Sequence, residues 1–144
     1  MGIQLKGEAG VLARLTSRRR KYAKAVIAGL QNAGEYLLDR SNYYVPIDKQ
    51  DLIASGHVRK TGRGYGTKVD VVYDAPHATY VHERTDLRHG EVYNKHYAED
   101  IAAGRTHARR PQEQAKYLER AANESHKELL AIIKASVLAA GGKR

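Results

Sequence analysis

Apolar residues recur at helical spacing along the first third of the chain. Residues 5–44 contain no proline, and at about 100° per residue seven of their apolar side chains fall within one arc of roughly 80°. This pattern predicts a long amphipathic helix with one core-facing side. Gly29 and Gly34 interrupt it and indicate either a bend or a close contact, so the helix is expected in one or two pieces. The seven positions are Leu12, Leu15, Tyr22, Val26, Leu30, Ala33 and Leu37.

The pattern changes at Pro46, which ends the helix because a residue before proline is disfavoured in the α region. Asp48 can cap a short helical turn that follows. Residues 57–60 and 67–73 then alternate polar and apolar positions on either side of the glycine-rich residues 61–66. This predicts a β-hairpin. Two strands alone are marginally stable, so the hairpin needs a helix, a third strand or a neighbouring subunit across it.

Helical signals alternate with polar segments in the second half of the chain. Pro76 fits the first turn of a helix over residues 77–83, and a second short helix is predicted over residues 93–103, after a polar loop. The last helix is predicted from Pro111 to about residue 139. Its apolar and small residues step by four and three, as in a seam that packs on another helix or on the sheet: Leu118, Ala122, Ser125, Leu129, Ile132 and Ser136.

Together these elements predict a single α+β domain over residues 1–144. It has a long N-terminal helix, a small antiparallel sheet with a hairpin, short middle helices, and a long C-terminal helix packed on the sheet. Residues 1–10 and 140–144 are expected to be flexible ends.

Composition narrows the possible chemistry. The 144 residues include no Cys, which excludes disulfides, thiolate metal sites and Cys nucleophiles. The apolar runs are too short to span a bilayer and the N-terminus lacks the core of a signal peptide, so a soluble protein made in the cytosol is expected. All ten aromatic residues are Tyr, a residue suited to half-buried positions and to interfaces.

Charge is concentrated near the N-terminus. The chain holds 25 Lys and Arg against 16 Asp and Glu, a net charge of +9. Residues 1–72 hold 13 basic and 6 acidic residues, whereas residues 73–144 hold 12 and 10. No recognition motif accompanies the basic run, so it fits contact with DNA phosphates without sequence readout, contact with an acidic partner, or a solvated helix face. The candidate contacts are Arg14, Arg18, Arg19, Arg20, Lys21, Lys24, Arg109 and Arg110.

Catalytic and metal signals are weak. His82, His89 and His96 are spaced by seven, but zinc sites need ligands paired at short spacing. No phosphate-binding glycine motif follows a strand and opens a helix. The sequence therefore predicts no enzyme, no metal and no cofactor.

Three short segments, in this order, carry a further signal. The first is YYVPIDKQDLIASG, the second VVYDAPHATYVHE and the third QAKYLERAA. Their order resembles the small tail-component family of long-tailed bacteriophages, also called tail-completion, neck or head–tail joining proteins. Lys49-Gln50 and Arg84-Thr85 depart from that family's pattern. The matching positions are Val45, Pro46, Asp48, Leu52, Ser55, Tyr73, Ala75, Pro76, Tyr80, Val81, Glu83, Lys116, Leu118, Glu119 and Ala121.

The resemblance implies a structural virion protein that joins head to tail as a subunit of a homo-oligomeric ring, expected to be six-fold. Its partners would be other copies of itself, a portal, adaptor or head-closure protein, and a tail terminator or tail tube protein, with DNA passing through the channel. The alternative is a basic DNA-binding accessory protein without sequence specificity. The expected interface residues are Val45, Pro46, Asp48, Leu52, Tyr73, Pro76, Tyr80, His82 and Glu83.

Overall fold

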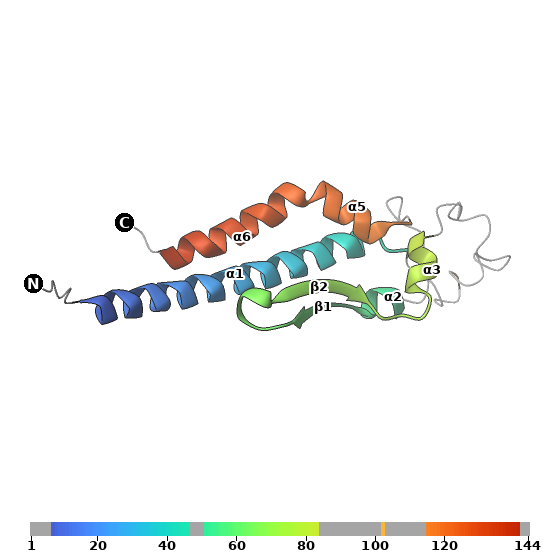
Figure 1. Cartoon of the computed structure of the whole chain (residues 1–144). Coiled ribbons are helices and arrows are strands. Elements are labelled where there is room, and N and C mark those ends of the chain that lie inside the picture. Colours follow the sequence, from blue (N-terminus) through green and yellow to red (C-terminus); the bar gives the residue numbers. More distant parts are fainter. Residues whose placement is uncertain (1–6, 47–50, 84–101, 103–114, 142–144) are drawn as a thin grey trace, which may run out of the picture.

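The computed structural model describes residues 7–46, 51–83, 102 and 115–141. The long helix α1 runs through the molecule, with the last two helices on one side and the hairpin on another (Figure 1). The α+β class predicted from the sequence is confirmed. In chain order the elements are α1 (Glu8–Tyr44), α2 (Asp51–Ala54), β1 (Gly56–Thr61), the 3₁₀ turn η1 (Gly64–Gly66), β2 (Lys68–Tyr73), α3 (Ala78–Glu83), α5 (Tyr117–Glu124) and α6 (His126–Gly141).

Helix α1 is one continuous helix of 37 residues, not two pieces. It includes residues 8–10, which were expected to be a flexible end. It ends at Tyr44, as the sequence predicted from Pro46, because Val45 takes an extended conformation before the proline. The Val45 N–H still donates to the Ser41 carbonyl at 3.1 Å, which satisfies one of the last carbonyls of the helix.

The two glycines of α1 are sites of close contact, and not of a bend. A Cβ atom on Gly29 would lie 3.0 Å from the Ile133 Cα in α6, and a Cβ on Gly34 would lie 3.0 Å from side-chain carbons of Val58 and Val69 in the hairpin. Five residues turn a helix by about 140°. Gly29 and Gly34 therefore let α6 and the hairpin approach α1 closely on different sides.

Strands β1 and β2 form an antiparallel two-stranded sheet with Val58 opposite Val71. Val58, Val71 and Val69 share the face toward α1, as the alternation predicted. On the opposite face, Arg59 lies 3.9 Å from Asp70. The helix across the hairpin is thus α1 itself.

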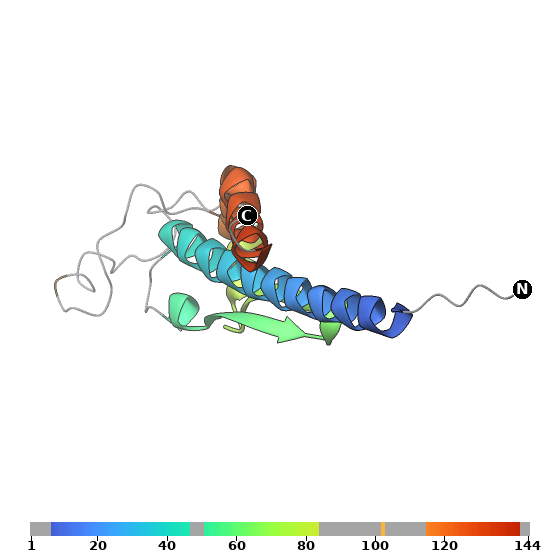
Figure 2. The ribbon, with the colours of Figure 1, turned by 90° about the vertical axis from the view of Figure 1, so that its left-hand side faces the viewer.

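Helix α6 packs on α1 and not on the sheet, which corrects the sequence-based expectation for most of the C-terminal helix. Helix α5 also packs on α1 and touches the sheet through the ring contact between Tyr117 and Tyr73. Figure 2 shows α6 and the hairpin on opposite sides of α1. The predicted single helix is also divided, because Ser125 leaves helical geometry, with φ −98° and ψ 8°, between α5 and α6. The break redirects the chain so that both halves pack on α1. The helix predicted over residues 93–103 lies outside the described residues, apart from the helical Ala102.

The core lies at the C-terminal end of α1. It is built by residues from α1, the turn after it, α2, α3 and α5: Tyr44, Val45, Leu52, Ala78, Val81, Tyr117 and Ala121. These positions include several from the three motifs that carried the family resemblance. The motifs therefore meet in space, although they are far apart along the chain.

Candidate interaction surface

The N-terminal half of the predicted core face of α1 is uncovered in the described chain. Leu12 is 62% exposed and Leu15 58%, whereas Ala33 on the same arc is buried. The sequence-based expectation of one continuous core face is therefore wrong for this half. The physical reason is length: α6 ends at Gly141, beside the Tyr22 hydroxyl, so it does not reach the first turns of α1 (Figure 1). We call the uncovered side chains the open α1 face: Val11, Leu12, Leu15, Tyr22 and Val26.

Basic side chains surround the open α1 face. Arg14, Arg18, Arg19, Arg20, Lys21 and Lys24 are all exposed. Within the described part of the chain, Arg19 stacks over the Tyr65 ring at 4.7 Å. The Tyr65 hydroxyl also donates to the Arg19 carbonyl at 3.1 Å. None of the other five cations forms an ion pair with a described residue. The exposure of these side chains leaves them within reach of a partner.

Four of the predicted interface residues are fully or partly buried within the fold. Val45 and Leu52 are buried in the core, so they do not offer a surface. Pro46 is half-buried. Tyr73 is half-buried, and its hydroxyl donates to Asn42 Oδ1 at 2.7 Å and lies 2.6 Å from the Ser41 hydroxyl. Burial raises the pKa of Tyr73 to about 12, although the hydrogen bond with Ser41 opposes this shift.

The exposed members of the predicted set gather at α3. Pro76 and Glu83 are exposed, Tyr80 is 52% exposed, and His82 is half-buried. The structure thus brings Tyr80 and Glu83 to the end of the molecule where the core lies. Asp48, Arg109 and Arg110 lie outside the described residues, and so do His89 and His96.

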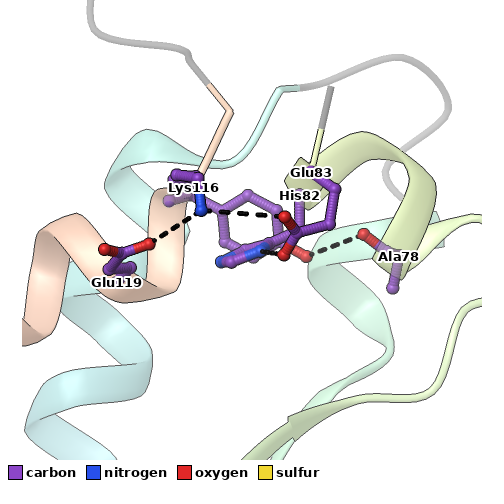
Figure 3. Close-up of polar contacts among 6 residues, drawn as sticks. Ala78, His82, Glu83, Lys116 and Glu119 are labelled. Atoms are coloured by element: carbon purple, nitrogen blue, oxygen red, sulfur yellow. Dashed lines mark hydrogen bonds and ion pairs between the residues drawn. The ribbon is translucent and has the colours of Figure 1, made fainter. Parts of the chain in front are cut away.

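A charged link ties α3 to α5 at this end (Figure 3). The Lys116 ammonium lies 3.1 Å from Glu119 Oε2 and 3.6 Å from Glu83 Oε2. Lys116 has a left-handed φ of 53°, and its N–H donates to the His82 carbonyl at 2.7 Å. The hydrogen bond from His82, with the charge of Lys116, lowers the pKa of Glu83. Lys116 and Glu119 belong to the third sequence motif, but the sequence alone did not show that Lys116 meets Glu83.

Tyr117 is a structural residue that the sequence analysis missed. It is 1% exposed, and its ring makes edge contacts with Tyr73 at 5.1 Å and His82 at 4.9 Å between ring centres. Burial raises the pKa of Tyr117 to about 12, with a contribution from Tyr73. The aromatic residue within QAKYLERAA was the available signal. His82 therefore packs against a core ring, and its Nε2 has no hydrogen-bond partner among the described residues.

Neither the described side chains nor the comparisons with known proteins point to a particular activity. In the described ranges, no three or more His, Asp and Glu side chains gather as metal ligands would. Within the same ranges, no helix combines the length and the apolar character needed to cross a membrane. Scans of protein-family models, of curated proteins and of solved structures each found no match to this chain.

Proposed function

We propose that this chain is a non-catalytic structural subunit of a tailed-bacteriophage virion. In this proposal it forms a homo-oligomeric ring in the neck, between the portal, adaptor or head-closure assembly and the tail terminator or tail tube. The observation that carries the proposal is the open α1 face. It supports an assembling subunit, and the order of the three sequence motifs supports the neck as the place of assembly.

Physical arguments favour a partner for this face. An exposed row of large apolar side chains is costly in water and typical of an interaction site. The first turns of α1 also lack the tertiary packing that supplies most of the stability of protein helices. Burial of Leu12 and Leu15 by a neighbour would contribute about 1.5–3 kcal/mol for each side chain.

The exposed basic residues fit the same proposal. A ring of such subunits places many positive charges around its axis or against acidic neighbours, and a positive surface attracts a DNA backbone without reading its sequence. Tyr80 and Pro76, exposed at the opposite end of the molecule, are suited to contact a second ring because Tyr buries a large area at low entropic cost.

The test is the mass of the purified protein in solution, by light scattering and native mass spectrometry, followed by negative-stain imaging. We expect ring-shaped oligomers, alone or after addition of purified heads or tails. A protein that stays monomeric and joins neither heads nor tails would contradict the proposal.

A basic DNA-binding accessory protein is the second candidate, favoured by the exposed cations in the first half of α1, which form no ion pair with a described residue. It predicts binding to free duplex DNA that weakens steeply with salt, because each neutralised phosphate releases counterions. Charge reversal of Arg18, Arg19 and Lys21 should abolish most of that binding. Duplex binding unchanged by this reversal would exclude α1 as the DNA contact.

A further inference from the structure

A second face of α1, distinct from the open α1 face, carries charges of both signs. We call it the charged stripe: Arg14, Arg18, Lys21, Ala28, Glu35 and Asp39. At about 100° per residue these six positions fall within an arc of roughly 100°, and all six are exposed. The basic members lie in the first half of α1 and the acidic members in the second half.

The rest of the described chain leaves this face free. Gly29 and Gly34 mark the directions in which α6 and the hairpin pack on α1. Ala28, in the middle of the stripe, points about 100° from Gly29 and about 120° from Gly34. At Ala28 the stripe therefore faces away from both α6 and the hairpin, which lie on opposite sides of α1 (Figures 1 and 2). A second helix can pack along this face.

The stripe is electrostatically unfavourable within one copy. Arg14 and Arg18 are four residues apart, and so are Glu35 and Asp39. Like charges at this spacing on a helix destabilise it. Among the described residues none of these four side chains has an ion-pair partner, so a partner from outside would relieve both clusters.

The stripe is also symmetric about Ala28. Lys21 and Glu35 lie seven residues before and after it, and Arg18 and Asp39 lie ten before and eleven after. We propose that two copies of the free protein pair antiparallel through this stripe, with a two-fold axis near Ala28. Lys21 of each copy then faces Glu35 of the other, and Arg18 faces Asp39. Each ion pair occurs twice, and the small side chain of Ala28 lets the helices approach closely at the crossing.

The mixed charge of the stripe favours a second, antiparallel copy of the chain over a parallel copy or DNA. A parallel pair would place like charges opposite one another, and DNA would meet the acidic half of the same stripe. A pair related by a two-fold axis closes at two copies, so it is separate from any ring contact and describes the protein before assembly. The pairing is independent of the proposed function, and either can fail alone.

Charge reversal tests the pairing. One variant carries Arg14→Glu, Arg18→Glu and Lys21→Glu, and a second carries Glu35→Lys and Asp39→Lys. Each places like charges opposite one another in its own dimer, so its dimer Kd should rise by about tenfold or more. An equimolar mixture restores opposite charges across the pair and should form a heterodimer. Sedimentation velocity and native mass spectrometry measure both. The control, Lys60→Glu, Arg63→Glu and Lys68→Glu, changes as much charge as the first variant on exposed residues of the hairpin and should leave the dimer unchanged.

Cross-linking tests the orientation, because a chain without Cys reacts only at introduced thiols. A Lys21→Cys chain mixed with a Glu35→Cys chain should be joined by a short bismaleimide, whereas Lys21→Cys alone should not. The two Lys21 positions of an antiparallel pair are about 21 Å apart along the helix axis. A wild-type protein that is monomeric across a concentration series would overturn the pairing. So would a dimer Kd unchanged by both charge variants, a mixture that forms no heterodimer, or cross-linking of Lys21→Cys to itself.

Discussion

Single residues decide how closely the elements of this molecule pack. Gly29 and Gly34 carry no Cβ where α6 and the hairpin come nearest to α1. The sequence identified both glycines as exceptional within a helical pattern. It could not distinguish a bend from a close contact, because that choice depends on elements about 25 and 100 residues further along the chain.

Gly29→Leu should destabilise the fold by about 1–3 kcal/mol, because the new side chain meets the Ile133 backbone and the Ser136 side chain. Urea unfolding measures the change. Gly10→Leu is the matched control: a Cβ there meets nothing within 4 Å, and loss of a helical glycine should make that variant equally or more stable. Equal stability of the Gly29→Leu variant and the wild type would contradict the close contact.

Tyr73 and Tyr117 make the fold sensitive to alkaline pH. Both have a pKa raised from 10.0 to about 12, chiefly because burial disfavours the phenolate. The folded state thus binds these protons more tightly than the unfolded state, so their contribution to stability is full below pH 10 and is lost as pH rises toward 12. Thermal unfolding across this range should show a falling midpoint. A Tyr73→Phe variant should lose part of this dependence, and an unchanged profile would contradict the assignment.

At the scale of elements, α1 has two functions along its length. Its C-terminal half packs against the hairpin, α5 and α6, whereas its N-terminal half leaves the open α1 face to solvent. The same hydrophobic period continues through both halves. Periodicity alone therefore predicted a core face and could not show where the covering elements end.

Substitution along this one face separates the two halves. Leu12→Ser with Leu15→Ser should change the free energy of unfolding by less than about 0.5 kcal/mol, because both side chains are already exposed in the free chain. The same pair should reduce ring formation and joining to heads or tails. Leu37→Ser, on the same arc but packed against the core, is the control and should lose about 1–3 kcal/mol. Normal assembly of the Leu12 and Leu15 variant would exclude the open α1 face as a contact.

At the scale of the whole molecule, the sequence predicted the class, the long first helix and the hairpin correctly. These depend on local signals: helical spacing, the proline that ends α1, and strand alternation around glycines. The C-terminal helix was predicted on the sheet and is found on α1. That choice depends on Gly29 meeting α6 and on the break at Ser125, both of which need the three-dimensional arrangement. Of the predicted interface, Val45 and Leu52 belong to the core because they pack with buried residues of α3 and α5.

The exposed end near α3 gives a prediction about assembly as a whole. Tyr80→Ala should impair the joining of rings or of heads and tails more than it lowers solubility or thermal stability, because Tyr80 is 52% exposed. Tyr65→Ala, at the tip of the hairpin and 66% exposed, serves as the control, with joining measured by co-sedimentation. Parallel losses of assembly and stability in Tyr80→Ala would assign that residue to the fold instead.

Because the core lies at one end of α1, the other end of the helix projects beyond the packed part of the molecule. The hairpin tip still holds the helix at Arg19, whose carbonyl accepts from the Tyr65 hydroxyl. The roughly 11 residues from Glu8 to Arg18 extend about 16 Å beyond this point at 1.5 Å per residue. A pivot of about 10° there therefore moves the free tip by about 3 Å, while the packed end stays in place. A subunit built in this way can meet neighbours at slightly different angles without straining its core.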